Sequence, residues 1–117
     1  MPHCIIEYSK ELEKEISPTE MIETTHDGTM ASGLFVENHI KSRAIAYEDF
    51  RTGEPELRFI HITAKIISGR TIEQKTSLSE SIQAQFKGVI SEKKLSKISV
   101  TVDVRDLQQE SYTKTIY

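Results

Sequence analysis

The residues best suited to chemistry lie at the start of the chain, where Met1 is followed by Pro2. Removal of an initiator methionine ahead of a proline exposes a secondary amine, a base whose ordinary pKa is about 8. Burial or a neighbouring cation lowers this pKa, because both disfavour the protonated form. A strand that begins at His3 holds the ring at the end of a sheet and fixes the direction of its nitrogen, as a general base requires. Many chains begin Met-Pro for no chemical reason, so the rest of the sequence has to decide.

Three cations are candidates for binding an anion beside this amine. Lys41 and Arg43 lie two residues apart in a predicted strand, so they project from one sheet face, together with His39. Arg70 follows another predicted strand and directly precedes a helix, whose N-terminus attracts anions. Cations placed there bind a carboxylate and also lower the pKa of the proline amine. The alternative is that Arg70 is solvated or forms a salt bridge, and that Lys41 and Arg43 belong to a solvated strand face.

Other kinds of site have little support in the sequence. The histidines His3, His26, His39 and His61 occur singly, without the spacing of metal ligands. Cys4 is the only cysteine, and its apolar strand predicts a core residue rather than a nucleophile. The sequence contains no phosphate loop, nucleotide fingerprint or Gly-x-Ser-x-Gly elbow. We therefore expect no metal site.

Composition narrows the class of protein further. The 117 residues suit one domain with a modest core. A net charge of −3 and a pI near 5.8 argue against a nucleic-acid partner, which requires a basic face. The sequence shows no membrane-spanning run and no leader, which predicts a soluble, cytoplasmic protein without membrane contact.

The predicted elements alternate between strands and helices. Strands are expected at 3–8, 40–47, 57–67 and 98–104. A capping Ser17 followed by Pro18 predicts a helix that runs from Pro18 to Gly33, weakened in its middle by Gly28. A second helix starts after Thr71, with Gln74 completing a capping box, and Lys93 and Lys94 are expected in its last turn. The segment between the first strand and the first helix is a charged connection with some helical tendency.

This order predicts one domain of two βαβ units, at about 2–47 and 57–104, followed by a polar tail at 105–117. Each unit should pair its two strands in parallel through a right-handed crossover, and the two middle strands could form a hairpin. In the strand at 57–67, apolar residues alternate with His61, Thr63 and Lys65, so one sheet face suits the helices and the other is semi-polar. We expect oligomerisation to cover this second face. In the tail, Tyr112, Ile116 and Tyr117 are possible docking points.

Four segments carry a resemblance to a known family. They are the opening Met-Pro-His-x-Ile-x-Glu-Tyr, the strand Ile-Lys-Ser-Arg at 40–43, the strand His-Ile-Thr-x-Lys-Ile at 61–66, and Ser-Gly-Arg-Thr-Ile-Glu-Gln-Lys at 68–75. Together they resemble the 5-carboxymethyl-2-hydroxymuconate Δ-isomerases, a family of the tautomerase superfamily of amino-terminal proline enzymes. The resemblance runs from Pro2 to about Val104. The segment at 69–75 is also similar to the one after the first strand of 4-oxalocrotonate tautomerase.

The resemblance implies a tautomerase/MIF-like fold, which is an α+β, two-layer α/β sandwich whose two βαβ units form a four-stranded mixed sheet with both helices on one face. It implies a homotrimer with its sheets facing inward, and a cofactor-free isomerase of homoprotocatechuate breakdown, an aromatic catabolic route. The family's proline moves a proton between carbon atoms of an unsaturated 2-hydroxy or 2-oxo acid with two or three carboxylates, and arginines hold those carboxylates and the developing oxyanion.

Two positions of this chain match the family's site directly. Pro2 matches the base, and Arg70 matches the arginine of the Gly-Arg turn. The family's other arginine falls at Lys41, where a point charge replaces a bidentate fork. Either Lys41 substitutes for it or Arg43 takes over, so the predicted site contains Pro2, Arg70, Lys41 and Arg43.

Two alternatives stay open on the sequence. The chain could be a relative that acts on another substrate, such as a phenylpyruvate-type tautomerase or a hydrolytic dehalogenase. It could also be a trimeric binding or signalling protein that kept the fold and lost the chemistry.

Overall fold

The computed structural model describes all residues, Met1–Tyr117. The elements follow one another in the order β1 (His3–Ser9), η1 (Lys10–Lys14), α1 (Pro18–Ala31), η2 (Glu37–His39), β2 (Lys41–Tyr47), β3 (Arg58–Ile67), α2 (Ile72–Glu92), β4 (Ile98–Leu107) and η3 (Gln109–Ser111). The four predicted strands and two predicted helices are all present. The charged connection after β1 is the short 3₁₀ helix η1.

The strands form one mixed sheet in the order β2-β1-β3-β4. The pairs β1–β2 and β3–β4 are parallel, as expected for two βαβ units, and β1 and β3 join the units in antiparallel fashion. The suggested hairpin between β2 and β3 is wrong, because β1 lies between them. The side chains of Cys4, Ile6 and Tyr8 in β1 are buried, and a strand with such a face gains most from a central position with a neighbour on each side.

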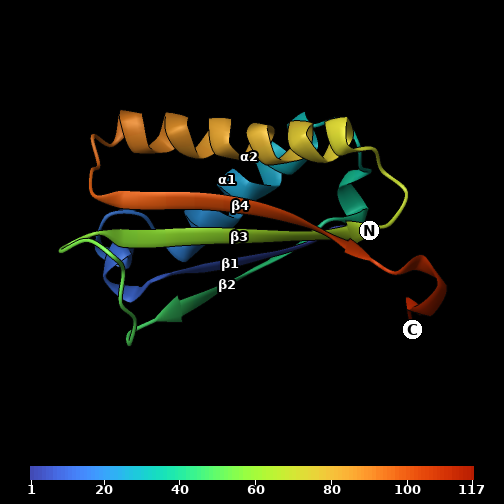
Figure 1. Ribbon diagram of the computed structural model, residues 1–117, viewed down its shortest axis with the longest axis horizontal. Coiled ribbons are helices and arrows are strands. Elements are labelled where there is room, and N and C mark those ends of the chain that lie inside the picture. The colour runs from blue at the N-terminus through green and yellow to red at the C-terminus, as the bar shows by residue number, and fades with distance from the viewer.

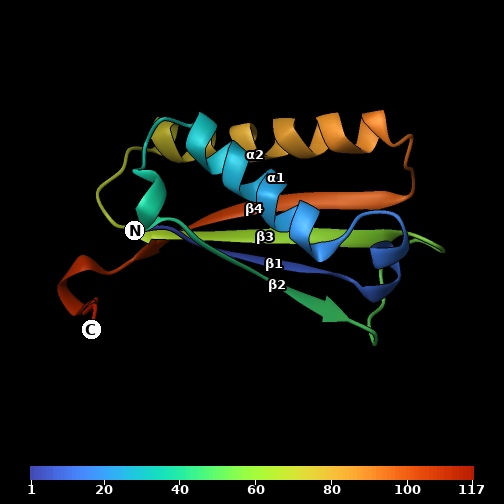
Figure 2. The same ribbon diagram turned by 180° about the vertical axis from the view of Figure 1, so that it is seen from behind.

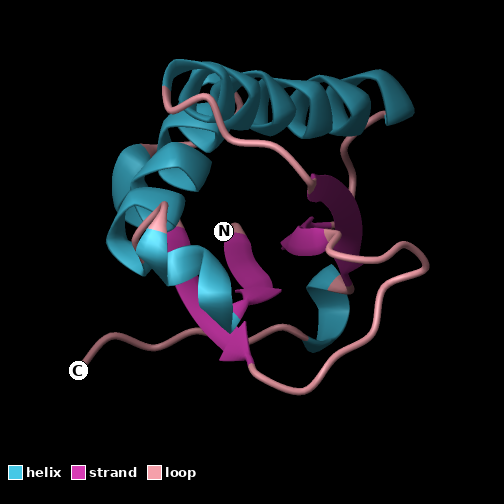
Figure 3. Ribbon diagram, turned by 90° about the vertical axis from the view of Figure 1, so that its left-hand side faces the viewer, coloured by secondary structure: helices cyan, strands magenta, loops and turns pink.

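Both helices pack on the same face of the sheet (Figures 1 and 2). When the molecule is viewed from one end of the sheet, α2 lies above the strands (Figure 3). The predicted alternation in β3 is confirmed: Ile60, Ile62, Ala64 and Ile66 are fully buried, whereas the residues between them are partly exposed. The core also takes Leu78, Ile82 and Phe86 from α2. The opposite, semi-polar face of the sheet carries no helix.

The two helices touch at Gly28. A Cβ atom built on this residue would lie 2.6 Å from the Cα atom of Ile82, closer than real Cβ contacts allow. Ser81 also donates a hydrogen bond of 2.7 Å to the carbonyl oxygen of Gly28. The glycine that weakens the isolated helix is therefore required by the packing of α1 against α2.

Strands β1, β2 and β3 each differ from expectation by one residue at one end, and three other boundaries need comment. Helix α1 ends at Ala31, and Gly33, expected as its C-terminal stop, lies just past the C-cap Ser32 with the positive φ of 73° that suits a glycine there. Helix α2 ends at Glu92, so Lys93 is its C-cap and Lys94 lies beyond the last turn. Strand β4 continues through Leu107, because the long β3 keeps offering partners up to Ile67.

Neither helix combines the length and the apolar character that crossing a bilayer requires.

Candidate active site

The start of the chain lies at the beginning of β1, one of the two inner strands of the sheet. Pro2 is buried, and its carbonyl oxygen accepts a hydrogen bond of 3.0 Å from the backbone N–H of Lys41. From His3 onward β1 pairs on both sides, with Lys41 of β2 and Lys65 of β3 opposite His3. These hydrogen bonds fix the position of Pro2. A general base needs such a fixed position at the start of the chain.

Arg70 lies in the turn between β3 and α2. Gly69, with a φ of 119°, adopts a backbone conformation that glycine tolerates, and Thr71 then caps α2. The Arg70 Nη2 atom donates a hydrogen bond of 2.9 Å to the carbonyl oxygen of Leu34, and the guanidinium carbon lies 5.2 Å from the centre of the Phe35 ring. Its Nε atom is buried without a hydrogen-bond partner. Arg70 is thus held by a carbonyl and an aromatic ring, and it has donors left for an anion.

The charged groups that act on the chain's amino group are all cations. The pKa of the Met1 amine is held below its ordinary value of 8.0, chiefly by burial and then by Arg70, Lys114 and Lys41. This amine stands one residue ahead of the one that removal of Met1 exposes. The Lys41 Nζ atom lies 3.5 Å from the Met1 sulfur. Three elements of the fold therefore bring positive charge to the place where Pro2 would present its nitrogen.

Lys41 and Arg43 occupy different positions relative to the amine. Both project from the open sheet face, as predicted, but the Arg43 Nη1 atom lies 3.4 Å from Nδ1 of His3, one residue further along β1. His39 does not share their strand, because it lies in η2, where the chain has not yet become extended. Of the two candidate strand cations, only Lys41 is among the charges that lower the pKa of the Met1 amine.

Sequence reasoning missed several residues at this end of the sheet. Lys114 comes from the polar tail, and nothing in its local pattern distinguishes it from a solvated lysine. Phe35 follows α1 in an irregular segment. His3 forms a hydrogen bond with the Tyr112 hydroxyl, 2.8 Å from Nε2, and its pKa is lowered by burial first and then by Arg43, Lys41, the amino terminus and Lys65. On the sequence alone, Tyr112 is only a possible docking point.

Cys4 takes the core position that its strand predicted. It is fully buried, and burial raises the pKa of its thiol, which lies 3.7 Å from the Thr29 hydroxyl. A buried thiol with a raised pKa is a poor nucleophile. No group of three or more His, Cys, Asp and Glu side chains is arranged to hold a metal ion.

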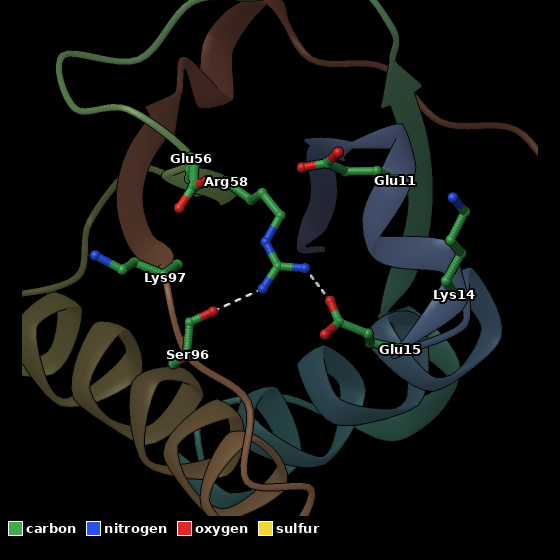
Figure 4. A pocket seen from close by; sticks show the side chains of 7 residues that line it. All are labelled: Glu11, Lys14, Glu15, Glu56, Arg58, Ser96 and Lys97. Atoms are coloured by element: carbon green, nitrogen blue, oxygen red, sulfur yellow. Dashed lines mark hydrogen bonds and ion pairs between the residues drawn. The ribbon is translucent and has the colours of Figure 1, made fainter.

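The largest cavity, of about 550 Å³, lies at the other end of the sheet and contains no apolar side chain. Its lining residues are Glu11, Lys14, Glu15, Glu56, Arg58, Ser96 and Lys97 (Figure 4). Arg58 forms a salt bridge with Glu15 and donates a hydrogen bond of 2.6 Å to the Ser96 carbonyl oxygen. Arg58 therefore has acceptors within the cavity lining. The cavity lies about 23 Å from the amine end, which is seven residues along β3 at roughly 3.3 Å each.

The chain is similar to several solved structures. A 5-carboxymethyl-2-hydroxymuconate delta-isomerase superposes with a TM-score of 0.84 at 14% identity, covering 100% of this chain and 89% of that one. A 5-carboxymethyl-2-hydroxymuconate isomerase from Deinococcus radiodurans R1 superposes with a TM-score of 0.80 at 20% identity, covering 97% and 88%. A fused 4-OT described as a symmetric trimer gives a TM-score of 0.68 at 17% identity, covering 92% and 86%. A search of curated proteins found no significant match.

The arrangement of strands and helices and these likenesses define the class: this is an α+β protein with the tautomerase fold. The family can be stated as well. The model of the 5-carboxymethyl-2-hydroxymuconate isomerase family matches residues 2–116, so the chain belongs to that family and is an isomerase.

Proposed function

We propose that this isomerase acts on 5-carboxymethyl-2-hydroxymuconate, in the breakdown of homoprotocatechuate, with Pro2 as its base. One observation carries the proposal: the buried start of β1 faces Arg70, Lys41 and Lys114, and none of the three forms a salt bridge. Unpaired cations around a weakened amine suit an anionic carbon acid, because they bind its carboxylates and keep the amine unprotonated.

The proposed reaction moves one proton and changes no oxidation state. The neutral nitrogen of Pro2 takes an enolic or allylic proton from the substrate, and the electron pair that is left spreads over the conjugated system as a dienolate. Arg70 and Lys41 stabilise the negative charge on its oxygens. The prolinium then returns the proton at the distant carbon, which regenerates the neutral amine. No cofactor takes part in this scheme.

The contribution of each part of this site to the reaction rate can be given as an order of magnitude. A positioned general base contributes about 10² to 10⁴-fold to the rate. A preorganised donor at the developing oxyanion contributes about 10² to 10³-fold. Because the substrate's proton is already acidified by conjugation to a carbonyl, these contributions suffice without a metal.

Intact mass and an ultraviolet assay test the proposal together. The protein should be lighter by one methionine, and it should change the absorbance of 5-carboxymethyl-2-hydroxymuconate at a rate that falls sharply in Arg70→Ala. A chain that retains Met1 cannot use Pro2 as a base. Activity only on phenylpyruvate or on a halogenated acid would instead identify a relative with another substrate, and no turnover of any of these would indicate a binding protein.

We also propose that the chain assembles as a homotrimer through the semi-polar sheet face. That face carries no helix, and Ile45 and Phe50, in and just after edge strand β2, are 47% and 40% exposed. The similar fused 4-OT is described as a symmetric trimer. Light scattering during size exclusion should give three times the 13.4 kDa chain mass; a monomer at micromolar concentration would contradict the assembly. The single-domain boundaries and the cytoplasmic location stay predictions.

A further inference from the structure

The C-terminal tail returns to the start of the chain. After β4 ends at Leu107, the segment Gln108–Tyr117 turns through η3, and both chain termini lie at the same end of the sheet (Figures 1 and 2). The backbone N–H of Gln109 donates to the Ser68 hydroxyl at 3.4 Å. Ser68 lies two residues before Arg70, so the tail is attached to the same turn that presents the guanidinium.

Tyr112 is the main anchor of this tail. Its hydroxyl lies 2.8 Å from Nε2 of His3, and the two rings meet edge to face with centroids 6.0 Å apart. Nδ1 of the same histidine lies 3.4 Å from Arg43. A chain of contacts thus runs from β2 through β1 to the tail, and it attaches the tail at Tyr112, two residues before Lys114.

Lys114 follows two residues later. Its side chain is exposed and forms no salt bridge, and its charge acts on the amino terminus more strongly than that of Lys41 does. The three cations around the amine therefore come from three different segments: Arg70 from the β3–α2 turn, Lys41 from β2 and Lys114 from the tail. An exposed lysine beside two other cations raises the free energy of the empty site, since like charges repel. A bound anion relieves that repulsion.

We propose that Lys114 is a third substrate-binding cation, positioned by Tyr112, and that it selects a tricarboxylate over a dicarboxylate. The inference rests on the proposed function for the substrate's identity. A muconate carries two carboxylates, and the carboxymethyl substituent adds the third. Arg70 and Lys41 supply one cation for each of the first two, and Lys114 supplies the third.

Kinetics with two substrates test this assignment. In Lys114→Gln, kcat/KM for 5-carboxymethyl-2-hydroxymuconate should fall by about tenfold, the lower end expected for one charge-assisted hydrogen bond, and the loss should appear in KM. For 2-hydroxymuconate it should change by less than about threefold, because this substrate lacks the third carboxylate. Lys114→Arg should restore most of the preference. Lys87→Gln, which removes the charge of an exposed lysine on α2, should leave both substrates unaffected.

Tyr112→Phe tests the positioning role separately. It removes the hydroxyl that meets His3 but keeps the ring, so the tail should loosen and KM for the tricarboxylate should rise several-fold with kcat unchanged. An equal loss for both substrates in Lys114→Gln, or an unchanged preference, would overturn the proposal. So would a loss confined to kcat.

Calorimetry keeps this test independent of catalysis. The wild type should bind propane-1,2,3-tricarboxylate about tenfold more tightly than glutarate, and Lys114→Gln should bind the two alike. If the wild type isomerises neither muconate, the proposed function fails, and the calorimetric preference still decides the role of Lys114. Equal affinities in the wild type, or binding of neither acid, would reject it.

Discussion

Both ends of the sheet carry cationic side chains, but Arg58 at one end is paired with a carboxylate and Arg70 at the other is not. At the far end, Arg58 is paired with Glu15, and the cavity around it carries further carboxylates from Glu11 and Glu56. At the amine end, Arg70 donates to a backbone carbonyl and stacks on Phe35, with no carboxylate as a partner. At the far end the positive charge of Arg58 is balanced by Glu15. The contacts of Arg58 also connect β3 to the end of η1 and to the segment before β4. The amine end leaves positive charge for a ligand to neutralise.

This difference in partners supports the proposed role of Arg70 more directly than burial or cavity size does. The Arg58 side chain is only 16% exposed and borders the largest cavity, yet both of its Nη atoms have acceptors, Glu15 and the Ser96 carbonyl oxygen. Arg70 borders no comparable cavity in the single chain, yet its Nε atom is buried without a partner. An arginine with unsatisfied N–H donors favours binding of an anion, because the anion accepts the missing hydrogen bonds.

The largest effect should come from moving the amine. A glycine inserted between Met1 and Pro2 turns the proline nitrogen into an amide, which is not basic, so kcat should fall by about 10² to 10⁴-fold. A glycine inserted between Gly53 and Glu54, in the exposed loop at the far end, is the matched control and should leave kcat unchanged. Isomerase rates and melting temperatures of both variants provide the measurement. Comparable activity of the two variants would remove Pro2 from the mechanism.

Exchanging the two arginines for alanine should affect different quantities. Arg70→Ala should lower kcat/KM by about 10² to 10³-fold with little change in melting temperature, because it removes an oxyanion donor. Arg58→Ala should keep its activity but lose about 1–2 kcal/mol of stability, since it breaks a partly buried salt bridge. Thermal melting should then drop by roughly 5–10 °C. If Arg58→Ala lost activity without losing stability, the two ends would have to be reassigned.

A smaller effect distinguishes the two cations of β2. Lys41 lowers the pKa of the Met1 amine, and we expect it to act in the same direction on the Pro2 amine one residue further on. Lys41→Gln should therefore raise the pKa of the Pro2 amine and move the acid limb of the kcat/KM profile to higher pH. Activity below the limb is lost because the protonated amine cannot accept a proton. Arg43→Gln should move the limb less, because Arg43 acts on His3 instead. A larger displacement in Arg43→Gln would show that Arg43 fills the strand position.

The smallest effect should come from salt. Raising the ionic strength from about 0.05 to 0.5 M shortens the screening length to a few ångströms, so KM for an anionic substrate should rise several-fold at the unpaired, exposed cations. The partly buried Arg58–Glu15 pair should be screened much less, and the melting temperature should change little over the same range. Kinetics and melting curves in sodium chloride would show this contrast. A salt-independent KM would mean that Lys41 and Lys114 do not meet the substrate.

Much of the fold could be predicted because its signals are local. The burial period of β3, the serine cap before Pro18 and the capping box at Thr71 all act within a few residues, and each is present in the structure. Strand order is different, because it depends on which apolar face gains most from a central position. The hairpin prediction failed for that reason. The need for Gly28 was hidden likewise, since only the approach of Ile82 creates it.

For the site, the sequence by itself determined the candidates Pro2, Arg70, Lys41 and Arg43. It also determined the resemblance to the isomerase family, and the match over residues 2–116 confirms that family. The tertiary structure decided their surroundings. It placed Lys41 against the Met1 side chain and Arg43 against His3, and it returned the tail to the start of the chain through the contact between Tyr112 and His3, 109 positions apart in the chain. Electrostatic interaction depends on distance in space, and no local pattern encodes which distant charges a folded chain will bring together.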